Sequence, residues 1–162
     1  MAAAGETVRQ AGAAEAERIA AVIHAAFAQY RGVLEPPSGA LALHAGEVRR
    51  LMELGGILVC ECDGQIAACV FHRTHPDHVY LGRLSVVPAF RGRGLGGRLV
   101  AAVEALAVAA GRDRVRLGVR LDLRRNRAFF ERLGYRQVGL DSHAGMTVPT
   151  FAWFEKPVGS RP

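Results

Sequence analysis

Residues 84–98, with the sequence LSVVPAFRGRGLGGR, restrict the possible folds more than any other part of the chain. An apolar, strand-like run ends at Pro88, a glycine-rich turn follows, and an amphipathic helix begins at once. The glycines allow backbone N–H groups to converge on an anion, and a helix N-terminus adds about half a positive charge at the same place. Arginines interleaved with the glycines add cationic donors: Arg91, Arg93 and Arg98. The segment therefore predicts a strand–turn–helix unit that holds a pyrophosphate.

The apolar residues on either side of this segment recur with two different periods. Spacings of three and four residues predict helices, whereas alternation and short β-branched runs predict strands. Helices are expected over residues 13–30, from a cap at Ser38 to Gly55 and Gly56, over 94–110 and over 125–133. Strands are expected over residues 6–10, 57–62, 65–73, 78–87, 114–119, 135–140 and 150–155. The order β-α-α-β-β-β-α-β-α-β-β predicts a three-layer α/β fold, in which helices cover both faces of a mixed sheet.

Length and composition narrow the class of protein. The 162 residues fit a single domain with an ordered core over about 6–157. No apolar run reaches the roughly 18 to 20 residues that span a bilayer, and no signal-peptide pattern is visible. Three clustered cysteines do not look like a disulfide framework, so the cytoplasm is the expected compartment. The net charge of +6, nearly all from arginine, leaves a nucleic acid or a polyanionic small molecule as possible partners.

Two well-known nucleotide-binding patterns compete for the glycine-rich turn. Gly92, Gly94 and Gly97 match the dinucleotide fingerprint GxGxxG. A Rossmann domain, however, places that turn after its first strand, and here it lies past the middle of the chain. A Walker loop is excluded because no Gly-Lys-Ser/Thr follows. The position and sequence of the turn therefore argue against both patterns.

Two motifs together resemble one known family. Residues 91–96 (RGRGLG), preceded by 84–88 (LSVVP), are similar to the acetyl-CoA motif Arg/Gln-x-x-Gly-x-Gly/Ala of the GNAT superfamily of N-acyltransferases. Residues 126–135 (NRAFFERLGY) resemble its second signature, with a slightly shifted alanine. The expected order of elements fits as well, so the resemblance extends over nearly the whole chain. It implies a GNAT-like fold with splayed central strands, and acetyl transfer from acetyl-CoA to a primary amine.

The resemblance also implies a role for each matching residue. Backbone groups of Leu84 and Val86 would contact the acetyl-pantetheine arm, and Asn126 would hydrogen-bond to it. Phe129 and Phe130 would pack near the cofactor. Acetyl-CoA would be a cosubstrate whose thioester the amine attacks directly in a ternary complex. The pyrophosphate would be held by the turn, which comprises Arg91, Gly92, Arg93, Gly94, Leu95, Gly96 and Gly97.

Two positions depart from the pattern of the family. Many relatives stabilise the leaving thiolate with a Tyr, but the matching residue here is Phe130. Some relatives carry a glutamate base on the strand before the turn, where this chain has Tyr80. An alkylammonium acceptor, with a pKa of about 10.4, must lose a proton before it attacks. Tyr80 is the candidate catalytic residue, although packing on a helix explains it equally well. No acidic residue lies on this strand, so a water chain could deprotonate the amine instead. Tyr135 is expected to be a packing residue.

Alternation along the strands gives further expectations. On the strand over 78–87, Tyr80 is expected to share a face with Gly82, Leu84 and Val86, and the other face is expected to carry Leu81, Arg83 and Ser85. The cysteines alternate with apolar positions and are expected to be core thiols rather than acyl carriers: Cys60, Cys62 and Cys69. A zinc site near three regularly spaced histidines is conceivable, but the triplet spans a turn, so no metal is expected: His72, His75 and His78.

The acceptor pocket in the family lies at the first two helices and their connection. In this chain Tyr30, Arg31 and Glu35 lie on that proline-stiffened connection and are candidate substrate-binding residues, although ordinary interhelix capping explains them equally well. Arg31 would favour a carboxylate or phosphate on the acceptor, and Glu35 would favour an amine. His143, in the loop before the last strand, could close the other side of the pocket.

Three functions remain after these arguments. The first is an acetyl-CoA-dependent N-acetyltransferase that acts on a small molecule, an amino acid or a protein amine. The second is a non-catalytic CoA-binding sensor on the same fold, suggested by Phe130. The third is a nucleic-acid-binding protein, which the charge suggests but which lacks a basic helix or interleaved aromatic and basic residues. We expect the first, with neither a nucleic acid nor a membrane as partner; homodimers are common in the family.

Overall fold

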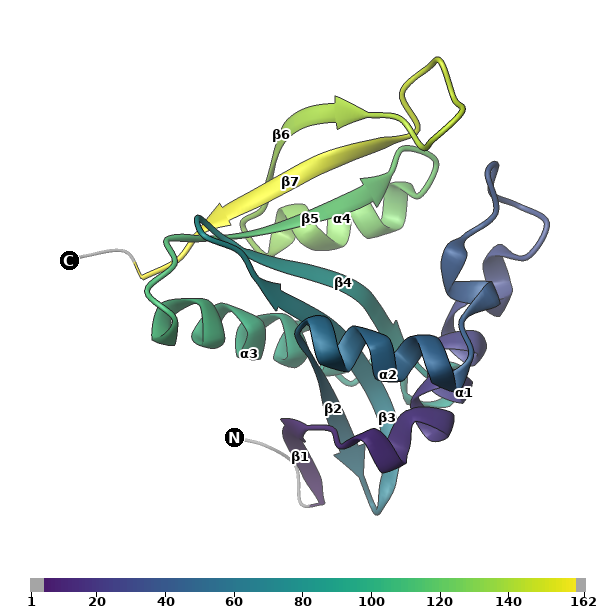
Figure 1. Cartoon of the computed structure of the whole chain (residues 1–162), viewed down its shortest axis with the longest axis vertical. Helices are drawn as coiled ribbons and strands as arrows, with labels where there is room; N and C mark the ends of the chain where they lie inside the picture. The colour runs from purple at the N-terminus through teal and green to yellow at the C-terminus, as the bar shows by residue number, and fades with distance from the viewer. Residues whose placement is uncertain (1–4, 160–162) are drawn as a thin grey trace. The chain divides into compact units, whose positions relative to one another are not determined.

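A computed structural model describes residues 5–159 of the chain. Seven strands form one sheet in the order β1-β2-β3-β4-β5-β7-β6, and four α-helices accompany them (Figure 1). This mixed sheet confirms the predicted α/β fold class and element order. None of the helices within residues 5–159 is long and apolar enough to cross a membrane. The ends beyond the predicted ordered core of about 6–157 lie mostly outside the described residues, which include only residues 5, 158 and 159 of them.

The chain divides into two compact units. The first contains residues 1–73 and 81–103, and the second contains residues 74–80 and 104–162. The prediction of a single domain stays a prediction.

The first unit contains strands β1 (Glu6–Gln10) and β2 (Gly56–Cys62), and β3 (Gln65–Thr74) except for its last residue. Consecutive strands are antiparallel neighbours: β1 pairs with β2, and β2 pairs with β3. Asp63 and Gly64 link β2 to β3 with φ of 51° and 79°, the left-handed pair that a two-residue hairpin turn requires. The predicted hairpin is therefore confirmed.

The first unit also contains α1 (Ala16–Phe27) and α2 (Ala45–Leu54). Short 3₁₀ turns extend α1 at both ends, so it fills the predicted range. The predicted start of α2 at Ser38 is wrong, because the Ser38 hydroxyl accepts from the Ala40 N–H at 3.3 Å and caps a separate 3₁₀ turn instead. Helix α2 begins at Ala45, where the Glu47 carboxylate accepts from the His44 N–H at 3.3 Å.

Strand β4 (Val79–Val86) leads through a 3₁₀ turn into α3 (Leu95–Ala109). The expected alternation fails at Arg83, which is exposed although Leu81 and Ser85 are buried. Arg83 has a φ of 54°, a left-handed conformation that is rare outside glycine and that interrupts the pleat. The Ser85 hydroxyl donates to the Arg83 carbonyl at 2.9 Å.

The second unit contains three antiparallel strands and one complete helix. Strand β7 pairs with β5 on one side and with β6 on the other. The first residues of β4 pair parallel with β5, through Val79 with Val115 and Tyr80 with Arg116. The bounds agree with the predicted ranges to within two residues: β5 (Arg114–Arg120), α4 (Arg124–Arg132), β6 (Arg136–Asp141) and β7 (Phe151–Pro157).

Candidate active site

The turn between β4 and α3 has the backbone geometry that its glycines predict. Gly92 and Gly94 have φ of 82° and 78°, and a Cβ on either would meet no atom within 4 Å. The Arg98 N–H donates to the Gly94 carbonyl at 3.1 Å as the first turn of α3 closes. The N–H groups of residues 95–97 precede this bond and have no acceptor within the helix. The turn therefore offers several backbone donors at the positive end of a helix dipole.

The three arginines near this turn have different partners. The Arg91 guanidinium donates to the Ala26 carbonyl at 3.1 Å, at the end of α1. Arg98 forms an ion pair of 2.8 Å with Glu6 on β1. Arg93 is exposed and lies over the Phe90 ring, with Cζ 5.0 Å from the ring centroid. Two of the arginines thus hold the turn to its own unit, and Arg93 adds an exposed charge beside it.

The remaining predicted residues of the turn contribute main chain rather than side chains. Leu95 is 1% exposed, so its side chain belongs to the core and only its N–H could meet a ligand. Gly96 and Gly97 lie in the first turn of α3. Leu84 and Val86, near the end of β4, are half-buried. An anion at this turn would therefore meet backbone N–H groups first.

Helix α4 carries the residues of the second motif. Asn126 and Phe129 are half-buried, and Phe130 is 8% exposed. The Phe130 ring packs edge-to-face against Phe129 at 5.0 Å and against Tyr135 at 5.7 Å between centroids. These contacts lie within the second unit. The predicted contacts of these residues with a cofactor stay predictions.

Tyr135 belongs to a partly buried polar cluster that the sequence did not indicate. Its hydroxyl donates to Glu104 Oε2 at 2.8 Å, and Lys156 Nζ lies 3.2 Å from both Glu104 oxygens. Tyr135 is 1% exposed, and burial together with the Glu104 carboxylate raises the pKa of its hydroxyl above the ordinary value. The predicted packing role of Tyr135 is confirmed.

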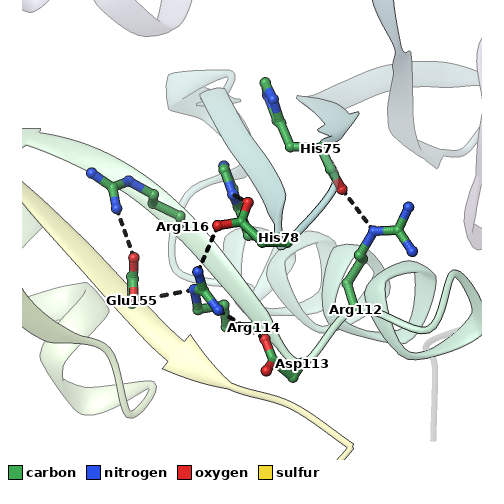
Figure 2. Close-up of polar contacts among 8 residues, drawn as sticks. His75, His78, Arg112, Asp113, Arg114, Arg116 and Glu155 are labelled. Carbon is green, nitrogen blue, oxygen red and sulfur yellow. Dashed lines mark hydrogen bonds and ion pairs between the residues drawn. The ribbon is translucent and has the colours of Figure 1, made fainter.

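Tyr80, the candidate catalytic residue, is half-buried at the start of β4. Its register partner is Arg116 on β5. Figure 2 shows that Arg116 reaches Glu155 on β7, with Nη1 2.8 Å from Oε2. Arg114 joins the same carboxylate at 3.4 Å and Asp77 at 2.8 Å. Sequence reasoning missed Glu155 and both arginines, because only the pairing of β5 with β7 brings them together.

Two of the three regularly spaced histidines contact each other, and His72 has other partners. The rings of His75 and His78 stack at 4.6 Å between centroids, and His78 Nδ1 lies 2.7 Å from Asp77. Arg112 donates through Nε to the His75 carbonyl at 2.7 Å (Figure 2). His72 contacts Gln10, and burial lowers its pKa below the ordinary value. Within residues 5–159, no group of three or more His, Cys, Asp or Glu side chains could hold a metal ion.

The cysteines are core residues, as predicted. All three are reduced and no more than 1% exposed. Burial raises the pKa of the Cys60 thiol to about 11 and of the Cys69 thiol to about 12. Such thiols are weak nucleophiles at neutral pH. This agrees with the expectation that they do not carry an acyl group.

The predicted acceptor residues lie in both units. Tyr30 packs edge-to-face on Phe27 at 5.8 Å, and Arg31 and Glu35 are exposed on the connection after α1. In the second unit, the His143 N–H donates to Thr150 Oγ1 at 3.0 Å, and its ring packs against Phe151. Burial, with repulsion from Arg120, lowers the pKa of His143 below its ordinary value. The joint role of these residues stays a prediction.

Comparison with known proteins gives one family and many similar structures. Residues 19–135 match the model of the acetyltransferase (GNAT) family. No curated protein sequence shows significant similarity to the chain. The fold resembles the ribosomal-protein-S18-alanine N-acetyltransferase from Escherichia coli, with 16% identity, 97% of this chain and 96% of that chain covered, and a TM-score of 0.77.

Two further structures contain a cofactor. One is the PaiA N-acetyltransferase from Thermoplasma acidophilum in complex with coenzyme A, with 17% identity, coverage of 94% and 98%, and a TM-score of 0.75. The other is YncA from Salmonella typhimurium with acetyl-CoA, with 18% identity, coverage of 97% and 96%, and a TM-score of 0.68. At these identities the likeness shows the fold.

Proposed function

Since this chain belongs to the acetyltransferase (GNAT) family, we propose that it transfers the acetyl group of acetyl-CoA to a primary amine of a small molecule, an amino acid or a protein. The amine nitrogen attacks the thioester carbonyl carbon directly in a ternary complex. The C–S bond then breaks, an amide forms, and CoA leaves as a thiolate that takes up a proton. The two related structures that hold coenzyme A or acetyl-CoA support this choice of cosubstrate.

The observation that carries the proposal is the open turn before α3. Left-handed Gly92 and Gly94 turn the main chain, and residues 95–97 present N–H groups without a helical acceptor. A pyrophosphate matches this arrangement because its oxygens accept several hydrogen bonds and its negative charge complements the helix dipole. Exposed Arg93 adds a cation on the solvent side of the turn. Leu84 and Val86 would contact the pantetheine arm through their main chain, and Asn126 and Phe129 would contact it from α4.

Tyr80 is the side chain that we propose to act on the acceptor. Its position on β4 beside Arg116 places a phenol near two charged residues, Arg116 and Glu155. An alkylammonium must lose a proton before attack, and a tyrosine can hydrogen-bond the amine and pass its proton to water. Tyr30, Arg31, Glu35 and His143 are proposed to bind the rest of the acceptor.

A non-catalytic CoA sensor is the alternative, and one observation favours it. Phe130 stands where many relatives carry a tyrosine, and the neighbouring Tyr135 hydroxyl is occupied by Glu104 at 2.8 Å. Neither residue can supply a proton to the leaving thiolate from this arrangement. In the enzyme, CoA would leave as a thiolate without help from an acidic side chain, because a thiol with a pKa of about 8.5 gives a good leaving group. The free thiolate would then take up a proton from water.

Calorimetric titration with acetyl-CoA, followed by an assay of thiol release with a broad panel of amines, tests the proposal. We expect binding at micromolar concentration and amine-dependent release of CoA. Replacement Gly94→Glu places a carboxylate where the pyrophosphate is proposed to bind and should abolish binding. Gly46→Glu is the matched control, because Gly46 on α2 is equally open but far along the chain from the turn. Binding without turnover of any amine would favour the sensor, and unchanged affinity in Gly94→Glu would refute the site.

Cellular location and assembly complete the proposal. The chain is proposed to act in the cytoplasm, without a nucleic-acid or membrane partner and without a metal. Sedimentation velocity at micromolar concentration decides between the proposed homodimer and a monomer.

A further inference from the structure

One face of the sheet in the second unit carries an unusual set of side chains. On β5 and β7 the opposite face is mostly buried, and five of its residues are no more than 4% exposed: Val115, Leu117, Val119, Ala152 and Phe154. Because side chains alternate along a strand, the residues between these lie on the other face. Those residues are half-buried or exposed rather than buried. This second face is therefore accessible within its own unit.

The strand registers place the residues of the accessible face in three rows. Directly paired residues of neighbouring strands lie on the same face of a sheet. The first row crosses four strands and contains Tyr80, Arg116, Glu155 and Arg136. The second row contains Gly118, Trp153 and Gly139. The third row contains Arg120, Phe151 and Asp141.

Trp153, Phe151 and His143 form a continuous aromatic cluster, which we call the aromatic face. The Trp153 and Phe151 rings meet edge-to-face at 5.1 Å between centroids, and Phe151 meets His143 at 5.1 Å. A Cβ at Gly118 would lie 3.3 Å from the Phe151 ring and 3.8 Å from Trp153, so the glycine allows both rings to lie over β5. A Cβ at Gly139, on the other side of Trp153, would meet nothing within 4 Å.

The polar groups around Trp153 restrict what it can bind. The Arg116 guanidinium already lies over the indole, with Cζ 4.4 Å from the ring centroid. A second cation on the same ring would face this positive charge at close range. The indole N–H donates to Asp141 Oδ2 at 3.2 Å, so its polar edge is also satisfied. What Trp153 still offers is flat apolar surface on the side of Gly139.

The first row connects this surface to the proposed chemistry. Tyr80 is the register partner of Arg116, and Arg116 contacts both Glu155 and Trp153. The Asp141 carboxylate borders the aromatic face and can attract the ammonium group of an amine, whereas Glu155 is already paired with Arg114 and Arg116. An acceptor whose ring lies against Trp153 can therefore keep its amine among polar groups on the same face.

We propose that the aromatic face binds the acyl acceptor, and that Trp153 selects amines that carry an aromatic ring or another flat apolar group. The inference rests on the proposed function, because it names the class of acceptor for that reaction. A ring stacked edge-to-face or offset on tryptophan gains dispersion energy and buries apolar area. A linear aliphatic amine gains less because it covers less of the indole.

Trp153 is the only tryptophan of the chain, so its fluorescence reports binding at this face directly. We would titrate the intact protein with phenethylamine and, separately, with butylamine, each with and without CoA. Phenethylamine should change the tryptophan emission saturably, at a concentration about tenfold lower than butylamine requires, because an aromatic contact contributes roughly the free energy of a tenfold change in affinity. Equal concentrations for the two amines, or no saturable change, would overturn the inference.

Kinetic variants give a second, independent readout. Trp153→Ala should raise KM for phenethylamine about tenfold, with little change in kcat, in KM for acetyl-CoA or in KM for butylamine. Trp153→Phe keeps a flat ring and should restore most of the preference, which a merely structural role would not explain. Leu140→Ala is the matched control: Leu140 pairs with Ala152 on the opposite face of the same sheet and is 54% exposed. Its acceptor preference should equal that of the wild type.

The outcomes separate this inference from the proposed function. If acetyl transfer proceeds but the Trp153→Ala variant has the same KM values for both amines as the wild type, the acceptor binds elsewhere. In that case only the inference fails. If the protein neither binds nor cleaves acetyl-CoA, the proposed function fails, and the fluorescence titration still decides whether the face binds flat amines.

Discussion

Alanine at Gly94 tests whether the backbone of the turn, rather than any side chain, binds the cofactor. Gly94 has a φ of 78°, and a Cβ there would meet no atom within 4 Å, so the substitution introduces backbone strain without a clash. Left-handed backbone costs a non-glycine residue about 1–2 kcal/mol. Alanine also loses less chain entropy on folding, which offsets about 0.4–1 kcal/mol. The net effect is a loss of about 1 kcal/mol in the free energy of unfolding.

That loss should appear as a fall in Tm of about 2–4 °C for a chain of this size. The larger effect is expected on the ligand. Relief of the strain rotates the peptide units around Gly94, so the N–H groups of residues 95–97 no longer converge, and affinity for CoA should fall at least tenfold by calorimetry.

Gly46→Ala provides the matched control for both measurements. Gly46 lies on α2 without a left-handed φ, and a Cβ there also meets nothing within 4 Å. In a helix this substitution should stabilise the protein by about 0.5–1 kcal/mol and leave CoA affinity unchanged. If Gly94→Ala behaved like Gly46→Ala in both stability and affinity, the backbone argument would be refuted.

Three further predictions concern stability and reactivity. Tyr135→Phe removes the hydroxyl that donates to Glu104 and should lower the free energy of unfolding in urea by about 1.5–3 kcal/mol, whereas an unchanged midpoint would contradict the network. Arg9 lowers the pKa of Glu15 to about 2, against an ordinary 4.5. The stability from this ion pair is therefore complete above pH 4.5 and is lost as the pH falls towards 2. In the Glu15→Gln variant, the midpoint of urea unfolding should change less with pH across that window. The buried cysteines should not react with Ellman's reagent at pH 8 until guanidinium unfolds the protein, and rapid labelling of the native protein would disprove their burial: Cys60, Cys62 and Cys69.

Most elements were predictable from the sequence because their signals are local. The hairpin turn at Asp63 and Gly64 needs two left-handed residues, and this dipeptide is one of the few that supplies them. The start of α2 was predicted wrongly because Ser38 is as good a cap for a short 3₁₀ turn as for a helix. The left-handed Arg83 has no sequence signal, because arginine seldom adopts that conformation.

In the candidate site, too, local features could be predicted from the sequence and distant contacts could not. Glycines between a strand and a helix indicate an anion-binding turn by themselves, since the required φ values and the free helical N–H groups depend on adjacent residues only. The partners of the arginines, in contrast, do not depend on adjacent residues and could not be predicted. Arg91 bonds to Ala26, 65 residues away, and Arg98 pairs with Glu6, 92 residues away.

The sequence by itself thus determined the order of the elements, the turn before α3 and the burial of the cysteines. Only the tertiary structure decided which charged groups are already paired and which side chains surround Trp153. The rows of residues on the accessible face join β4, β5, β6 and β7. A shift of one residue in any of these registers would move the side chains to the other face of the sheet. Local backbone preference is set by a few neighbouring residues, whereas cross-strand neighbours are set by pairing across the whole sheet.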